Sequence, residues 1–118
     1  MSELWKRTIN GKEVLFVNSS RNTRHGFAHD TEVFINGWNY GSNTAYYLNR
    51  TWERFTYQTV MRGAIIKLRE DRKERLTEDF KERYGYKKLT DKRREELKAE
   101  ISNDSELELY TAILEELV

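Results

Sequence analysis

Two Asn-Gly dipeptides, Asn10-Gly11 and Asn36-Gly37, constrain the fold of this 118-residue chain more than any other feature of its sequence. Asn-Gly is the strongest two-residue signal for a β-hairpin, because both residues tolerate the positive φ of a type I′ turn. The residues on either side of both pairs are rich in β-formers. The first half of the chain is therefore expected to form two antiparallel hairpins.

Four strands are expected around these turns, and they cover residues 4–9, 12–17, 27–35 and 38–48. The third strand alternates well, so that one of its faces carries Phe27, His29, Thr31, Val33 and Ile35. The fourth is expected to be interrupted or bulged around residues 41–43, Gly-Ser-Asn. Turn formers and basic residues dominate residues 18–26, which we expect to be an exposed loop.

The second half of the chain is expected to be helical. Apolar residues fall close to helical spacing after Asn49; they are Trp52, Phe55, Val60, Met61, Ala64, Ile65 and Leu68. Asn49 or Thr51 can cap this helix, and Thr56 can cap a second start if the helix breaks. We expect the helix to persist to Tyr84 and to end at Gly85.

Two shorter helices are expected after it. Thr90-Asp91 opens one that runs to about Ile101, and Ser105 opens the last one. The sequence thus predicts an α+β fold, with an N-terminal antiparallel β-meander of about four strands packed against a C-terminal set of three or four helices. We expect one domain over 1–118, with the meander in 1–48 and the helical half in 49–118.

Composition excludes several kinds of chemistry. The chain has no cysteine, which rules out disulfides, thiolate zinc sites and iron–sulfur clusters. It shows no signal-peptide pattern and no apolar run long enough to span a membrane, so we expect a cytoplasmic protein.

No residue set matches a known catalytic pattern. The two histidines, His25 and His29, are too few for a metal site without distant ligands. Ser19 or Ser20 beside His25 is the candidate nucleophile pair, but it lies in the expected loop and lacks a nucleophile-elbow motif. We therefore expect no catalytic residue, no metal and no cofactor, and a protein that is not an enzyme.

Basic residues offer a possible nucleic-acid contact. The candidates come from the expected loop and from the long helix: Arg21, Arg24, Arg69, Arg72, Lys73 and Arg75. Strand aromatics could add a stacking surface: Trp38, Tyr40, Tyr46 and Tyr47. Acidic residues interleave with these cations, however, and the formal net charge is only +1. Aromatic strand residues are also more often part of a core.

The C-terminal residues 102–118 carry five acidic residues and no basic one. These are the candidate partner-binding residues, and they form an acidic surface: Asp104, Glu106, Glu108, Glu115 and Glu116. Leucines between them make an amphipathic helix, whose apolar stripe is buried either by the fold or by a partner. A homodimer is a further possibility, because the charged segment 56–84 could pair with its own copy, although its apolar spacing is too irregular for a sustained heptad seam.

The stretch Tyr46–Met61, which follows the hairpin at Asn36–Tyr40, resembles a pattern in short proteins of phages and mobile elements of Gram-positive bacteria. Some small proteins of that setting are anti-defence factors, including anti-CRISPR proteins that block a type II Cas nuclease. The resemblance implies a phage or mobile-element inhibitor in the cytoplasm of a bacterial host, with a host protein such as a Cas nuclease as its partner. It carries over no functional residue. We therefore expect a non-enzymatic protein-interaction module, and the alternative is a small nucleic-acid-binding regulator.

Overall fold

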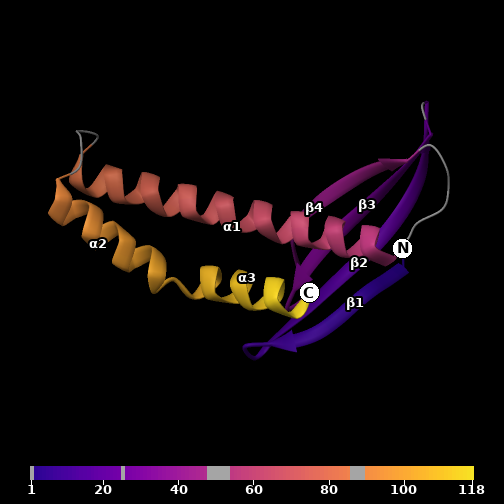
Figure 1. Cartoon of the computed structure of the whole chain (residues 1–118), viewed down its shortest axis with the longest axis horizontal. Coiled ribbons are helices and arrows are strands. Elements are labelled where there is room, and N and C mark those ends of the chain that lie inside the picture. Colours follow the sequence, from indigo (N-terminus) through magenta and orange to yellow (C-terminus); the bar gives the residue numbers. More distant parts are fainter. Residues whose placement is uncertain (1, 25, 48–53, 86–89) are drawn as a thin grey trace.

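The computed structural model describes residues 2–24, 26–47, 54–85 and 90–118 (Figure 1). An antiparallel four-stranded sheet, in the order β1-β2-β3-β4, is followed by three helices. The strands are β1 (Ser2–Ile9), β2 (Lys12–Thr23), β3 (Gly26–Ile35) and β4 (Trp38–Tyr47). The helices are α1 (Arg54–Tyr84), α2 (Asp91–Ser102) and α3 (Ser105–Glu116). The predicted α+β meander with C-terminal helices is confirmed.

Both Asn-Gly pairs form the predicted turns. Asn10 and Gly11 have φ values of 51° and 76°, and Asn36 and Gly37 have values of 50° and 81°. The second turn is also attached to β2, because the Glu13 N–H donates to the Asn36 side-chain oxygen at 2.9 Å and the Asn36 N–H donates to the Glu13 carbonyl at 2.9 Å. Asn36 therefore joins two hairpins as well as closing one.

The expected exposed loop at 18–26 is wrong. β2 continues to Thr23 and pairs with β3 in unbroken register from Val14↔Ile35 to Thr23↔Gly26. Two polar side chains of this stretch have partners on the neighbouring strand: the Arg21 Nε donates to Asp30 at 3.0 Å, and the Ser20 hydroxyl lies 2.8 Å from the His29 Nδ1. Residues typical of turns therefore serve as strand residues here, since their backbone groups pair with β3.

The helices follow the sequence signals closely. α1 is continuous over all its described residues and ends at Gly85, whose φ is 91°. Thr90 caps α2 by accepting a hydrogen bond from the Arg93 N–H, as predicted. Asp104, rather than a residue inside the helix, caps α3. The proposed caps Asn49 and Thr51 lie outside the described residues.

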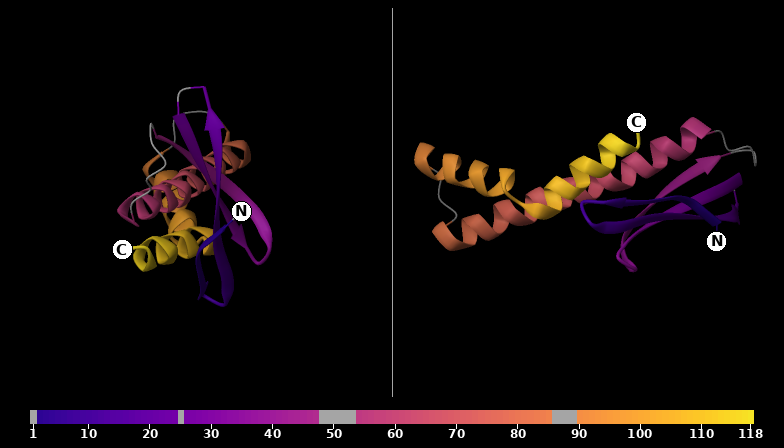
Figure 2. Two further views of the ribbon diagram at one scale, coloured as in Figure 1. Left: turned by 90° about the vertical axis from the view of Figure 1, so that its right-hand side faces the viewer. Right: turned by 90° about the horizontal axis from the view of Figure 1, so that it is seen from below.

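The first part of α1 and α3 cover one face of the sheet, and the core lies between the two layers (Figure 2). Its buried members alternate along β2 and β3 and recur at helical spacing on α1 and α3. They include Val14, Phe16, Val33, Ile35, Met61, Ile65, Leu109, Ile113 and Leu117. The predicted inward face of β3 is confirmed for its described side chains, because His29, Thr31, Val33 and Ile35 are all buried.

A bulge in β4 brings the strand close to α1. Val33 pairs with Gly41 and Phe34 pairs with Asn39, which leaves Tyr40 as the extra residue, one position before the expected range. A Cβ atom on Gly41 would lie 3.3 Å from a methyl carbon of Leu68. Glycine at this position therefore permits the close approach of sheet and helix.

The helical layer is longer than the sheet. The last part of α1 and all of α2 extend beyond the sheet as a two-helix arm, and α3 returns to cover the sheet (Figures 1 and 2). The molecule is accordingly elongated, with extents of 52 × 34 × 23 Å. None of the helices, over the residues described, is both long and apolar enough to cross a membrane.

Candidate interaction surface

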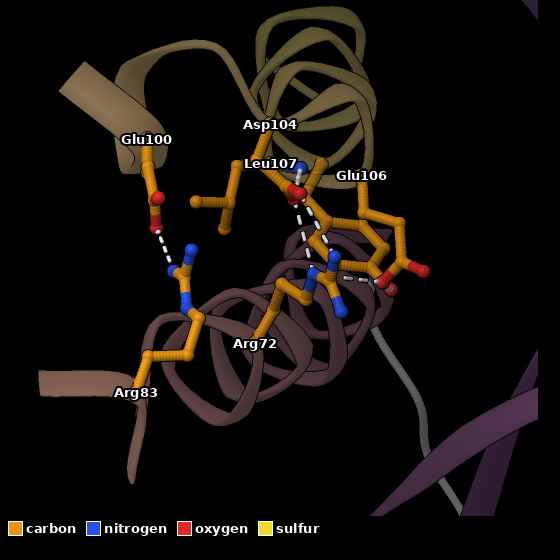
Figure 3. A network of polar contacts seen from close by, with 7 residues as sticks. Arg72, Arg83, Glu100, Asp104, Glu106 and Leu107 are labelled. Atoms are coloured by element: carbon orange, nitrogen blue, oxygen red, sulfur yellow. Dashed lines mark hydrogen bonds and ion pairs between the residues drawn. The ribbon is translucent and has the colours of Figure 1, made fainter. Parts of the chain in front are cut away.

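One charged cluster fastens α3 to α1. The Arg72 guanidinium donates two hydrogen bonds to the Asp104 carboxylate, at 3.1 Å from Nε and 2.8 Å from the terminal nitrogen (Figure 3). The same Nε lies 3.5 Å from the Glu106 carboxylate. The hydrogen bonds from Arg72 lower the pKa of Asp104 below its ordinary value, and those to Asp104 raise the pKa of Arg72.

Asp104 also begins the helix that it helps to hold. Its carboxylate accepts a hydrogen bond from the Leu107 N–H at 3.1 Å, which satisfies one of the free N–H groups of the first turn. The negative charge of Asp104 also interacts favourably with the dipole of α3, because it lies at the N-terminal end of the helix. Asp104 therefore acts as helix cap and ion-pair partner at once.

A second ion pair closes the projecting arm. The Arg83 guanidinium donates to Glu100 of α2 at 2.6 Å (Figure 3). Two guanidinium groups lie close to the Tyr84 ring, that of Arg93 at 4.0 Å from the ring centroid and that of Arg83 at 5.5 Å. Phe80 is fully buried beneath them, so aromatic and cation–π contacts hold the two helices of the arm together.

Between α1 and α3 lies an open groove of about 370 Å³. Arg69 and Lys73 of α1 line one wall, and Glu108 and Glu115 of α3 line the other. Among the described residues, none of these four side chains forms an ion pair. Arg69 and Lys73 are one helical turn apart, and Glu108 and Glu115 are two turns apart, so each pair lies on one face of its helix. The Nε of Arg69 is buried without a hydrogen-bond partner. The groove thus presents charges of both signs that the fold leaves available.

The five acidic candidate residues divide into two groups. Asp104 and Glu106 turn inward to Arg72, and Glu106 also accepts a hydrogen bond of 3.4 Å from the Tyr110 hydroxyl. Glu108, Glu115 and Glu116 are exposed. The apolar stripe between them is buried by the fold itself, since Leu107, Leu109, Leu114 and Leu117 all belong to the core.

The six basic candidates are not brought to one place, although Arg69 and Lys73 share a wall of the groove. Arg21 pairs with Asp30 on the sheet and Arg72 pairs with Asp104, while Arg24, Lys73 and Arg75 are exposed. Arg21 and Arg24 lie at the β2 end near the turn to β3, far along the molecule from the middle of α1 (Figure 1). They do not form one continuous basic face with the α1 residues.

Of the candidate serine–histidine pairs, the structure describes the serines. Ser20 lies across from His29, with its hydroxyl 2.8 Å from the His29 Nδ1, and His25 lies outside the described residues. Ser19 occupies the neighbouring position on β2, from which a strand residue points to the other face of the sheet. Among the described residues, no group of three or more potential ligands is placed to hold a metal ion.

Two exposed features of the protein were not predicted from the sequence. One is the opposition of Arg69 and Lys73 to Glu108 and Glu115, although the spacing of each pair already places it on one helix face. The other is Trp38, which was considered for a stacking surface but not as a single exposed anchor; its side chain is 76% exposed beside the second hairpin turn. A tryptophan this exposed offers an apolar contact to a partner.

Comparison with known proteins gave no match: no family model, no curated protein and no solved structure is significantly similar to this chain.

Proposed function

We propose that this chain is a non-enzymatic protein-interaction module, and that its partner binds along the groove between α1 and α3. The observation that carries the proposal is the opposite charge of the two walls, Arg69 and Lys73 against Glu108 and Glu115. Charges that face a groove without pairing across it remain available to a ligand, at little cost to the fold.

The signs of these charges favour a protein over a nucleic acid. A phosphate backbone carries one sign only, so Glu108 and Glu115 would repel it wherever Lys73 attracted it. A polypeptide segment with both acidic and basic side chains can match both walls. The floor of the groove includes the apolar side chains of Ile101, Leu107 and Ala112, which suits a partly apolar peptide or helix.

The specific form of the proposal is an inhibitor, encoded by a phage or mobile element, that acts in the bacterial cytoplasm on a host defence protein such as a Cas nuclease. It rests on the resemblance of the Tyr46–Met61 stretch and on the exposed carboxylates of α3. A nuclease must have a basic channel for its nucleic acid, and Glu108, Glu115 and Glu116 offer negative charge to such a channel. Competition with the nucleic acid would then be the mode of inhibition.

A direct binding measurement tests this. The tagged chain is used to capture partners from a nuclease-treated bacterial lysate that contains defence proteins, and is then titrated against a purified type II Cas nuclease with its guide RNA. We expect Glu108→Gln combined with Glu115→Gln to weaken binding by about tenfold, because both carboxylates of one wall are lost. The matched control, Glu78→Gln with Glu82→Gln, changes two exposed carboxylates on the arm and should leave binding unchanged.

Two outcomes would contradict the proposal. One is capture of no protein at stoichiometric amount from the lysate. The other is equal binding by the groove variant and the control, with both folded as judged by circular dichroism. A protein captured through the groove that is not a Cas nuclease would retain the interaction module and remove its anti-CRISPR form.

The nucleic-acid-binding regulator stays the second candidate, because Arg24, Lys73 and Arg75 are exposed and make no ion pair in the described part of the chain. A nucleic-acid-binding protein is recognised by a logarithm of the affinity that falls linearly with the logarithm of the salt concentration. Lys73→Ala with Arg75→Ala should reduce that slope by about two, one for each phosphate that the variant no longer neutralises. If the chain is such a regulator, the Glu108→Gln and Glu115→Gln variant would bind nucleic acid more tightly instead of losing a partner.

A further inference from the structure

The second helix of the projecting arm is poorly covered. α2 is 12 residues long and none of its residues is buried. A helix of this length is marginal in water without tertiary packing, and α2 contacts the rest of the fold mainly along one side, through Arg93, Glu100 and Ile101. Packing of a second surface against the opposite side of α2 would therefore stabilise this helix.

That opposite side carries an ordered series of charges. Asp91, Arg94, Glu95 and Lys98 are all exposed, and their spacing of three, one and three residues places them along one face of the helix. The order of signs is negative, positive, negative, positive. Read in the reverse direction, the order becomes positive, negative, positive, negative, so every position meets its opposite.

Reversal is what a two-fold axis imposes on a helix that packs against its own copy in antiparallel orientation. We propose that this chain forms a homodimer through α2, with the axis passing between Arg94 and Glu95. Each Arg94 then faces Glu95 of the partner subunit, and each Asp91 faces Lys98 of the partner subunit. Every pair occurs twice, which gives four ion pairs across the interface.

The surroundings of this face suit the same occupant. A shallow cavity of about 450 Å³ lies along it, bordered by the four charged residues and by Leu97 and Ile101. The only ion pair that the monomer forms with these four charges, among the residues described, is the loose contact of 3.9 Å between Arg94 and Asp91, in which the Asp91 side chain is fully exposed. A second copy of the chain would therefore replace only this one weak ion pair when it binds to the four charged side chains.

Sedimentation velocity over a concentration series of roughly 1 to 100 µM tests the dimer. The wild-type chain should shift from monomer to dimer within this range. Arg94→Glu alone and Glu95→Arg alone should each weaken dimerisation by about tenfold or more, because each turns two attractions into two repulsions. Lys67→Glu, an exposed change of the same charge on α1, is the control and should leave dimerisation unchanged.

Charge exchange makes the test specific to the register. An equal mixture of the Arg94→Glu and Glu95→Arg chains should form a mixed dimer, because every facing pair is again of opposite sign. The double variant R94E/E95R should dimerise like the wild type for the same reason. A wild-type chain that stays monomeric over the whole range would overturn the proposal, and so would a mixture that fails to associate.

A cross-link gives a readout that does not depend on affinity. The chain has no cysteine of its own, so Asp91→Cys with Lys98→Cys introduces the only two thiols. Seven residues of helix separate them by about 10 Å, too far for a bridge within one chain. Oxidation should produce a covalent dimer, whereas Glu108→Cys with Glu115→Cys, at the same spacing on α3, should not. Equal cross-linking of both pairs would contradict the proposed interface.

Discussion

Arg72 and Asp104 are 32 positions apart in the sequence, yet two hydrogen bonds of 3.1 and 2.8 Å join their charged groups. Both side chains are largely withdrawn from water, with exposed fractions of 23% and 11%. A pair with two-point geometry and this degree of burial differs from an ordinary surface ion pair, which contributes little. The pair fixes the position of α3 along the axis of α1, and so positions the groove between these two helices.

Loss of the Asp104 carboxylate should therefore destabilise the protein. Asp104→Ala removes the cap of α3 and leaves the Arg72 guanidinium without its partner, for an expected loss of about 2 to 3 kcal/mol in the free energy of unfolding. Urea denaturation followed by circular dichroism measures it. Asp104→Asn keeps a side-chain oxygen for the cap and should lose less. The same loss for both variants would show that the cap contributes nothing, and no loss in Asp104→Asn would show that the ion pair contributes nothing.

Acidification should weaken the fold through His29. Burial lowers the pKa of His29, and the nearby Asp30 carboxylate only partly opposes this. The unfolded chain then binds a proton more readily than the folded one, so the free energy of unfolding should be largest at neutral pH and fall as the pH drops below about 6.5. Denaturation midpoints at a series of pH values report this fall. In His29→Gln this decrease in the free energy of unfolding should be smaller. An unchanged decrease in that variant would show that other groups cause it.

The change Gly63→Ala should have opposite effects on stability in the wild-type protein and in the Asn43→Ala variant. A Cβ atom at this position would lie 2.7 Å from the Asn43 Nδ2, which donates a hydrogen bond of 3.1 Å to the Val60 carbonyl. Gly63→Ala should therefore destabilise the protein by about 1 kcal/mol, because the displaced hydrogen bond outweighs the gain in helix propensity. With Asn43→Ala already present, the same change should stabilise by up to about 1 kcal/mol. Unfolding of all four proteins in a double-mutant cycle decides it, and a stabilising effect in both backgrounds would mean that Asn43 moves freely.

Two of the three tryptophans, Trp38 and Trp5, should differ sharply in their contribution to stability. Trp38 is 76% exposed, so Trp38→Ser should change the free energy of unfolding by less than about 0.5 kcal/mol. Trp5 packs edge-on against Phe16 at 5.6 Å between ring centroids, with the Arg7 guanidinium 5.5 Å from its ring, so Trp5→Ser should cost about 2 to 3 kcal/mol. Thermal unfolding compares them, and a large loss at Trp38 would reveal a packing role for it.

The predictions from sequence succeed where the determinant is local. The turns at Asn10-Gly11 and Asn36-Gly37, the cap at Thr90 and the helix end at Gly85 each depend on a few adjacent residues, and all are found as expected. The prediction for residues 18–23 fails because their backbone pairs with β3, which local composition cannot indicate.

The candidate surface was harder to predict because its residues act in pairs across the fold. Arg72 was assigned to a basic surface and Asp104 to an acidic one, whereas in the structure they neutralise each other. Interleaved charges do not reveal which of them will be paired. A hint for Asp104 was present in its position just before Ser105, where an N-cap is expected.

The order of elements along the chain also affects how the protein can be made. The last helix and the residue after it supply Ile113 and Leu117 to the same core that holds Ile9 and Phe16 from the first two strands. A ribosome releases the N-terminal residues first, so the apolar face of the sheet is synthesised well before α3 can cover it. The apolar face of the meander is therefore exposed while synthesis continues, and a chaperone that shields this face until synthesis ends should increase the yield of folded protein.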